Sequence, residues 1–200
     1  MHVELPNHPG AAPARRQAAG YTLIEVCTIL VVLGILAAIA VPRLDFSGYA
    51  VDTAAQTASA VLLSAQRQAV QREHNVVVAF DTAGARLRIH DDANNNLQVD
   101  AGEEVRYESL GDAVHFGHGT APAGAPGEGA VGFIFQQDGM PALVFHRDGS
   151  ASEEGGFYIT STQGLLDPAH AHDARAGMIQ RSTGRALWYS YGTSGWEVAQ

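Results

Sequence analysis

The sequence predicts an α+β protein in which a long N-terminal helix, membrane-spanning in its first part, packs on an antiparallel β-sheet domain. Residues 21–41 form a nearly unbroken apolar run, and residues 50–73 are rich in Ala, Gln and Leu without Gly or Pro. Beyond residue 75, short β-rich runs alternate with turn residues. At 200 residues, the chain has room for one ordinary domain and an anchor.

The composition limits the classes of partner. The chain has 21 acidic residues against 12 basic ones, all of them Arg, and a formal charge of -9. Such a charge repels phosphate backbones, because nucleic-acid binders concentrate positive charge. The single cysteine, Cys27, lies inside the apolar run and has no partner in the chain, so disulfides play no part in the predicted fold.

At the N-terminus, a polar segment typical of a leader peptide precedes an apolar segment typical of a membrane anchor. Residues 1–20 are polar or small and end in Arg15, Arg16 and, four residues on, Gly20. The apolar run that follows corresponds to about 30 Å of helix, enough to cross a bilayer once. An ordinary secretory signal places its apolar core before the cleavage site, the reverse of this order. We therefore expect cleavage after Gly20, a cytoplasmic N-terminus set by the leader arginines, and a periplasmic remainder.

The stretch after the anchor continues as helix. Bends are expected near Pro42 and Gly48. One face carries small apolar residues at spacings of three and four, which indicates packing against a sheet. These residues are Val51, Ala54, Ala58, Val61, Ala65 and Ala69. The predicted segments are the leader 1–20, the transmembrane helix 21–42, its continuation 43–73 and the β-rich domain 74–200.

Nine short runs in the last segment are predicted strands of one antiparallel sheet or two. Gly-containing turn signals at 148–149, 183–184 and 192–195 separate several of them. Segments 118–130 and 164–175 are predicted loops. The runs are 76–81, 86–90, 105–109, 113–117, 131–137, 142–147, 156–162, 176–181 and 185–191.

The start of the apolar run carries a specific motif. The seven residues 20–26, GYTLIEV, resemble the type III signal of type IV prepilins and type II secretion pseudopilins. The resemblance implies that a prepilin peptidase cuts after Gly20 and methylates the new N-terminal residue, Tyr21, which stands where the family usually has Phe. Pro42 matches the helix-kinking proline of such subunits.

Glu25 is the acidic residue of this motif. A charge in a spanning helix costs about 2.5–3.5 kcal/mol at mid-span and less near the interface. In the family, the matching glutamate pairs with the N-terminal amine of the neighbouring subunit, which corresponds to Tyr21 here. The alternative is that Glu25 snorkels to the headgroups.

The C-terminal half resembles the GspH/FimT group of this superfamily through 144–150 (VFHRDGS), 157–160 (FYIT) and 179–185 (IQRSTGR). The resemblance implies a GspH-like minor pseudopilin of a type II secretion system. A FimT-like minor pilin, acting in type IV pilus biogenesis or DNA uptake, is the alternative. Either would sit in the bacterial inner membrane as a single-pass protein. It would meet membrane lipid, the prepilin peptidase, other minor and major pseudopilins or pilins, and the inner-membrane assembly platform.

The segment 92–103 (DANNNLQVDAGE) has the spacing of an EF-hand calcium loop. Position 6, normally Gly, is Leu97, so the sharp turn is expected to fall on Asn95 or Asn96 at positive φ. The alternative is an Asn-rich hairpin loop closed by Asx turns. Similar loops occur in FimT-like members. The side chains at positions 1, 3, 5, 9 and 12 are Asp92, Asn94, Asn96, Asp100 and Glu103.

Two groups of histidines are further candidates for metal binding. His170 and His172 beside Asp167 and Asp173, and the pair at 115 and 118, lack the four ligands of a structural zinc site, so solvated loop histidines are favoured. The sequence has no Gly-x-Ser-x-Gly motif and no Gly-rich phosphate loop, so we expect no enzyme activity and no cofactor other than calcium.

The C-terminal arginines are interleaved with aromatic residues, a pattern suited to phosphate contact and base stacking. The alternative, which we favour, is that the aromatic residues pack the last hairpins and the arginines pair with acids. Nucleic acid is therefore a disfavoured partner. The residues concerned are Arg175, Arg181, Arg185, Trp188, Tyr189, Tyr191 and Trp196.

Overall fold

A computed structural model describes residues 21–40 and 46–199, apart from the side chains of residues 39 and 40. The chain divides into two units, Met1–Leu44 and Asp45–Gln200. The predicted leader 1–20 with its cleavage residue Gly20, and Pro42 with its predicted bend, lie outside the described residues.

The first unit contains α1 (Leu23–Ala40). The Oγ1 atom of Thr22 accepts a hydrogen bond from the backbone N–H of Glu25, 3.3 Å away, at the start of this helix. Large apolar side chains are exposed along its length, from Leu23 at 83% to Leu36 at 57%. Within residues 21–40 and 46–199, no helix combines the length and the apolarity needed to cross a membrane.

The second unit opens with α2 (Ser47–Arg72). Phe46, before it, is not helical, and Glu73, after it, is left-handed with φ 59°. The predicted stripe is confirmed except at one position, where Leu62 is buried and Val61 is only partly buried. The predicted continuity of α1 and α2 falls on residues 41–45, which lie outside the described residues. The buried residues of α2 are Val51, Ala54, Ala58, Leu62, Ala65 and Ala69.

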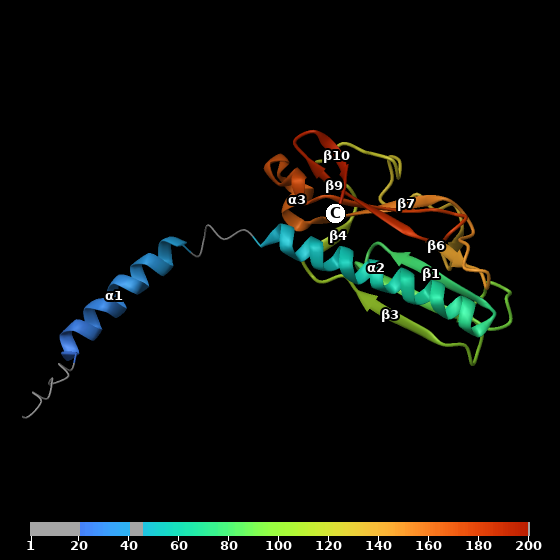
Figure 1. The fold of residues 1–200 in the computed structure, drawn as a ribbon, viewed down its shortest axis with the longest axis horizontal. Coiled ribbons are helices and arrows are strands. Elements are labelled where there is room, and N and C mark those ends of the chain that lie inside the picture. Colours follow the sequence, from blue (N-terminus) through green and yellow to red (C-terminus); the bar gives the residue numbers. More distant parts are fainter. Residues whose placement is uncertain (1–20, 41–45, 200) are drawn as a thin grey trace, which may run out of the picture. The chain divides into compact units, whose positions relative to one another are not determined.

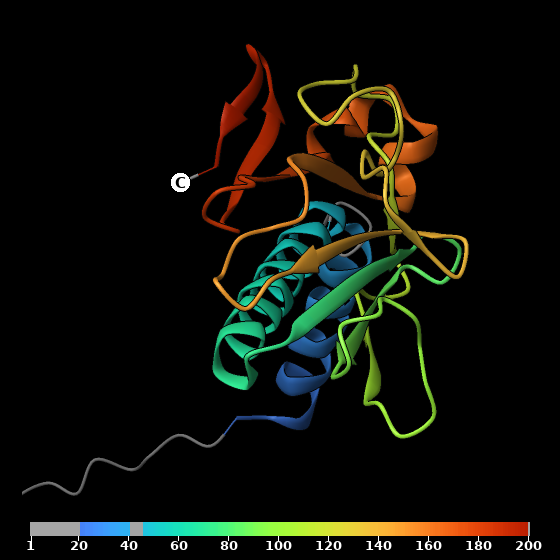
Figure 2. The ribbon, with the colours of Figure 1, turned by 90° about the vertical axis from the view of Figure 1, so that its right-hand side faces the viewer.

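Two five-stranded antiparallel sheets follow. The first has the order β3-β2-β1-β6-β5, and the second has the order β10-β9-β8-β7-β4. Figures 1 and 2 show β3 and the β9–β10 hairpin on opposite sides of the unit. The strands of the first sheet are β1 (Asn75–Asp81), β2 (Arg86–Asp92), β3 (Val105–Ser109), β5 (Gln136–Gln137) and β6 (Met140–Phe145). Those of the second are β4 (Val114–Phe116), β7 (Gly155–Ser161), β8 (Arg175–Ile179), β9 (Ala186–Gly192) and β10 (Gly195–Val198).

Most predicted strands coincide with these elements, but the run 131–137 is largely not a strand. Only β5 pairs with β6, while Val131 forms an isolated bridge to Phe157. The strand β10 was not predicted. It exists because residues 195–198 pair with β9 across the predicted turn at 192–195. The predicted loop 118–130 contains no helix and no strand.

The predicted loop 164–175 is wrong, because it is mostly helical. It holds most of α3 (Thr162–Leu166) and the 3-10 helix η2 (Pro168–Asp173). Ser161 caps the first, since its Oγ accepts a hydrogen bond from the N–H of Gly164 at 2.8 Å. Asp167 caps the second through the N–H of Ala169 at 2.9 Å, with a proline in its first turn. These are ordinary N-terminal helix signals compressed into a few residues.

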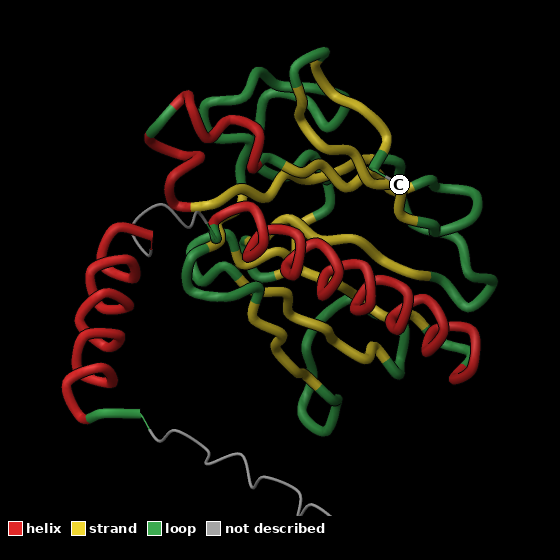
Figure 3. Tube along the Cα trace, turned by 60° about the vertical axis from the view of Figure 1, so that its left-hand side comes forward, coloured by secondary structure: helices red, strands yellow, loops and turns green. Residues whose placement is uncertain are grey.

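The core lies between α2 and both sheets, and α2 runs across strands of each (Figure 3). Phe80 of β1 is at its centre, with ring centroids 4.9 Å from Phe157 and 5.8 Å from Phe116. A smaller cluster around Val77, Ala79, Ala142 and Val144 lies on the other face of the first sheet. Leu97, Phe135 and Met140 pack against it.

Candidate functional site

The N-terminal motif residues Tyr21 and Glu25 lie at the start of α1. Tyr21 is 78% exposed, and Glu25 is an exposed residue of the first helical turn. Thr22 precedes the helix, and its bond to the N–H of Glu25 follows the Thr-x-x-Glu pattern of a capping box. A carboxylate in the first turn is also favoured by the helix dipole. Glu25 therefore has a local structural reason to stand there.

The loop between β2 and β3 is closed by Asx turns, as the alternative interpretation predicted. The fully buried Asp92 accepts the N–H of Asn96 at Oδ1 and the N–H of Leu97 at Oδ2, both at 3.0 Å. The side-chain oxygen of Asn94 also accepts the N–H of Asn96, and that of Asn96 accepts the N–H of Gln98. The first half of the loop is thus folded tightly around its own backbone.

The second half of the loop brings the other predicted ligands together. The side-chain amides of Asn94 and Asn96 donate to Oδ2 of Asp100 at 2.8 and 2.7 Å. These bonds, that from Asn94 first, hold the pKa of Asp100 below its usual range. The N–H of Asp100 in turn donates to Glu103 at 3.0 Å. All five predicted positions therefore share one loop of connected polar groups.

The sharp turn of this loop falls partly where it was not expected. Asn95 has φ 59°, as predicted, whereas the second left-handed residue is Leu97 itself, with φ 64°. Its side chain packs on the outer cluster of the first sheet, and its carbonyl accepts a hydrogen bond from Gln137 at 2.9 Å. Apolar packing and this bond compensate for a backbone conformation that normally favours glycine.

Glu103 is held by residues that the sequence did not single out. The fully buried His90 lies with its Nε2 2.7 Å from Oε2 of Glu103, and its Nδ1 accepts from Gln137 at 3.0 Å. The hydrogen bond between His90 and Glu103 is the main reason that the pKa of Glu103 lies below its usual value. The Glu103 side chain is 7% exposed, and its other oxygen, Oε1, is buried without a hydrogen-bond partner. Gln137 is 47 residues from His90, so no local pattern could have shown this contact.

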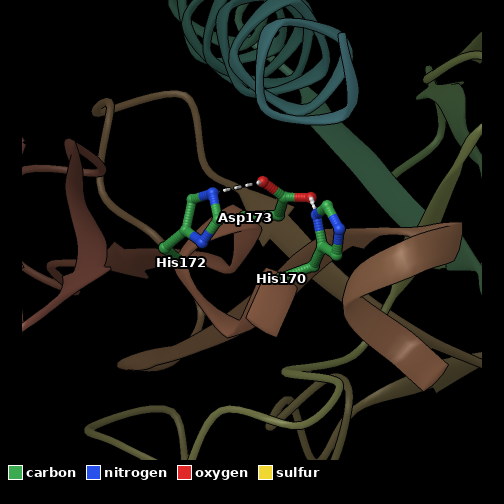
Figure 4. Close-up of side chains that lie close together, drawn as sticks. All are labelled: His170, His172 and Asp173. Carbon is green, nitrogen blue, oxygen red and sulfur yellow. Dashed lines mark ion pairs between the residues drawn. The ribbon is translucent and has the colours of Figure 1, made fainter. Parts of the chain in front are cut away.

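The histidines considered for metal binding separate into two cases. His115 contacts the hydroxyl of Thr162 at 3.1 Å, and His118 contacts the carbonyl of Ala121 at 2.5 Å. His170 and His172 instead lie beside Asp173 on η2 (Figure 4). The solvated interpretation fits His172, which is exposed, but Asp173 is fully buried.

The C-terminal aromatic residues pack, as the favoured alternative predicted. Trp196 donates to the carbonyl of Pro122 at 2.9 Å, and its ring lies 5.4 Å from that of Tyr158. Trp188 meets Phe157 edge to face at 5.5 Å. Arg175 forms an ion pair at 2.8 Å, with Asp52 of α2. Arg181 and Arg185 are exposed.

Together these features define a class of protein. A strongly apolar N-terminal helix opening on residues 22–25 (TLIE), and a long helix packed on antiparallel sheets, are the parts of a pilin-like subunit. The family model described as "Type II transport protein GspH" matches residues 54–179, and the chain belongs to this family. The resemblance inferred from the C-terminal motifs is thereby confirmed.

Individual proteins are similar to this chain over most of their length. "Pilin-like protein PilA1" of Thermus thermophilus is 32% identical over 129 residues, which cover 62% of this chain and 79% of the relative. The solved structure of the minor pseudopilin EpsH from the Type 2 Secretion System of Vibrio cholerae aligns at 12% identity with a TM-score of 0.32. It covers 72% of this chain and 92% of EpsH.

Proposed function

We propose that this protein is a minor pseudopilin, a structural subunit of the periplasmic pseudopilus of a type II secretion system. Membership of the GspH family is the observation that carries the proposal. The described residues include an apolar N-terminal helix and a separately packed domain, and both features suit a subunit that assembles with other pseudopilins. The protein acts through its position in a filament and catalyses no reaction.

The proposed anchor is the segment 21–42, left at the N-terminus when a prepilin peptidase cuts after Gly20. The subunit would cross the bacterial inner membrane once, with its domain in the periplasm, and would then meet the assembly platform. Support comes from α1, whose large apolar side chains are exposed on all sides rather than on one stripe. A helix that is apolar all round suits lipid or a bundle of similar helices. Residues 41 and 42 of the segment are not described.

Glu25 would direct assembly by pairing with the methylated amine of Tyr21 in the neighbouring subunit. A carboxylate within lipid is costly, and a cation from a neighbour would offset that cost. Tyr21 and Glu25 are both exposed at the start of α1, and no described side chain forms an ion pair with Glu25. The capping bond uses the backbone of Glu25 and leaves its carboxylate available to a neighbour.

The test is a comparison of Glu25→Ala with Thr28→Ala in cells that express the full chain. Thr28 lies one turn on, and its hydroxyl donates a hydrogen bond to the carbonyl of Ile24 at 2.8 Å. We expect mass spectrometry to find Tyr21 as the mature N-terminus in both variants. Only Glu25→Ala should be absent from sheared or cross-linked filament fractions. Mature protein that begins at Met1, or normal incorporation of Glu25→Ala, would refute the proposal.

A FimT-like minor pilin is the second candidate, favoured by the similarity to PilA1, which is named a pilin-like protein. If the protein served DNA uptake, the full chain in detergent should retard duplex DNA in a gel, with affinity falling steeply as salt rises. The net charge of -9 argues against DNA binding. So does the ion pair with Asp52, because it already engages Arg175. We expect no retardation; salt-sensitive retardation would favour the pilus instead.

We further propose that the loop 92–103 binds Ca²⁺. Calcium takes six to eight oxygen ligands, and the loop offers carboxylate or amide oxygens at positions 1, 3, 5, 9 and 12. The carbonyl of Gln98 stands at position 7, where EF-hand loops use the backbone. The buried Oε1 of Glu103, which lacks a hydrogen-bond partner, supports the proposal, because an ion would satisfy it.

The calcium proposal is tested by comparing Glu103→Gln with Glu104→Gln. The two variants make the same change at neighbouring positions, but Glu104 is 53% exposed and lies outside the ligand set. Calcium at 100 times its Kd should raise the stability of the wild type and of Glu104→Gln by about 2.7 kcal/mol. Glu103→Gln should lose most of that gain. No calcium-dependent change in melting temperature in the wild type would exclude the site.

A further inference from the structure

Three potential metal ligands converge on η2. The Nδ1 atom of His170 lies 3.8 Å from Oδ2 of Asp173, and the Nε2 atom of His172 lies 3.5 Å from Oδ1 (Figure 4). The two imidazole rings stack with centroids 5.9 Å apart. One ligand atom from each of the three residues falls within 4.8 Å of the others. One imidazole thus lies beside each oxygen of the Asp173 carboxylate.

Asp173 is the unusual member of this cluster. Its side chain is fully buried, and Oδ2 accepts a hydrogen bond from the Ser161 hydroxyl at 2.5 Å. Its Oδ1 atom is buried without a hydrogen-bond partner. Gly48 lies over it in the first turn of α2, where an added Cβ would be 3.3 Å from Oδ1. A buried carboxylate oxygen without a donor is costly, so a ligand at this position would have a physical purpose.

The hydrogen bonding of His172 indicates which of its atoms faces Asp173. Its Nδ1 lies 3.0 Å from the carbonyl oxygen of Ala169, and a carbonyl only accepts hydrogen bonds. Nδ1 therefore carries the proton, and in the neutral ring the lone pair of Nε2 points toward the unpartnered Oδ1. Metal-bound histidines typically donate their other N–H to a carbonyl in this way.

The distance between His172 and Asp173 is better explained by a metal ion bound by both residues than by a hydrogen bond between them. A charge-assisted hydrogen bond from an imidazolium to a carboxylate is about 2.7–2.9 Å long, shorter than the 3.5 Å observed between Nε2 and Oδ1. Zinc lies about 2.0–2.2 Å from nitrogen and oxygen ligands, so its tetrahedral ligands are roughly 3.3–3.5 Å apart. The 3.5 Å between Nε2 of His172 and Oδ1 of Asp173 lies in that range, and the 3.8 Å between Nδ1 of His170 and Oδ2 is slightly above it.

Neighbouring contacts hold the cluster in place. Arg175 donates to the carbonyl of His172 at 2.8 Å and pairs with Asp52, so it ties η2 to α2. Asp167 caps the start of η2 and leaves the ligand set to the other three residues. His172 is 61% exposed, so the cluster is open to solvent on one side. An ion could enter from that side and complete its coordination with water.

We infer that His170, His172 and Asp173 form a binding site for a divalent transition metal, with Zn²⁺ as the probe of choice. Three protein ligands and an open position are typical of zinc sites that keep an exchangeable ligand. This inference rests on the domain alone and holds whichever filament the subunit joins.

Isothermal titration of the metal-free full chain in detergent with ZnCl₂ tests the inference. We expect one saturable site, weakened at least tenfold in His172→Ala and unchanged in His115→Ala. His115 is a matched control because its ring contacts only the hydroxyl of Thr162 among the hydrogen bonds of the described residues. His172 is mostly exposed, so its loss should not disturb folding.

A second variant and a spectroscopic signal make the result decisive. Asp173→Asn removes the buried charge and should also abolish the site, and a thermal melt without metal shows whether it folds. Cobalt substitution should give visible absorption bands in the wild type that His172→Ala lacks. Absence of saturable zinc binding in the wild type, or equal affinity in His172→Ala, would overturn the site.

Discussion

The two long helices of this chain use apolar residues in opposite ways. In α1, large side chains such as Leu30 (62% exposed) and Leu33 (55%) are exposed around the helix. In α2, the buried stripe consists mostly of alanine, and the larger Leu63 and Val70 lie outside it. The comparison shows that the more apolar of two helices is not necessarily the one that packs in the core. A helix that packs across two sheets needs mostly small side chains on its buried face, because many large ones would hold the helix away from the strands.

The helices also begin differently. The first turn of α1 has a side-chain cap, from the Thr22 hydroxyl to the N–H of Glu25. Phe46, at the corresponding position of α2, makes no side-chain capping bond. The start of α1 is therefore stabilised locally, whereas α2 relies on packing.

The largest expected effect comes from a charge within the alanine stripe. Ala58→Asp would bury an unpaired carboxylate, because Ala58 is fully buried. We expect a loss on the order of 5 kcal/mol, comparable to the whole stability of many domains. The matched control is Ala60→Asp on the exposed side of the same helix, which should cost about 0.7 kcal/mol or less. Urea unfolding followed by circular dichroism measures both, and equal losses would contradict the one-sided packing of α2.

A smaller effect is expected from a charge on α1. If α1 lies in lipid, Leu30→Arg should cost about 2.5–3.5 kcal/mol of insertion free energy, roughly a hundredfold in membrane partition. The same substitution at Leu63 of α2, 45% exposed, should leave membrane association unchanged. Fractionation of cell extracts with an antibody to the domain measures the difference. Membrane association that survives Leu30→Arg undiminished would contradict the proposed anchor.

The smallest effect concerns the uncapped start of α2. Phe46→Ser would supply a hydroxyl that can accept a hydrogen bond from an N–H of the first turn, a contribution of about 0.5–1 kcal/mol. Phe46→Ala is the matched control, because it removes the same ring without adding a cap. The serine variant should melt a few degrees above the alanine variant. If the two variants melted at the same temperature, a side-chain cap would add nothing at the start of α2.

Local patterns predicted much of the fold but not all of it. The β-rich runs bounded by turn residues located β1, β2, β3 and β6, because β-branched and aromatic residues between turns favour strands. Leu62 was missed in favour of Val61, since the two adjacent residues fit the stripe almost equally and only the sheets choose between them. The helix η2 was missed because its capping signals, at Asp167 and Pro168, occupy only two residues.

The candidate sites also combine features that are visible in one stretch of sequence with contacts between distant segments. The spacing of Asp92 to Glu103 was visible in one stretch of sequence, as was the motif containing Glu25. The contacts of Glu103 with His90, and of His90 with Gln137, join three separate segments and were not visible. The convergence of His172 on a buried Asp173 depends on the helical turn of η2 and on the covering α2.

By itself, the sequence determined the apolar N-terminal helix with its acidic residue, the small-residue stripe of α2 and most strands, because each is encoded in residues that lie close together in the chain. Only the tertiary structure decided the pairing order of the two sheets, the burial of Asp173 and the anchoring of Leu97 and Glu103. Burial and long-range hydrogen bonds depend on which distant segments meet, and sequence periodicity contains no information about that meeting.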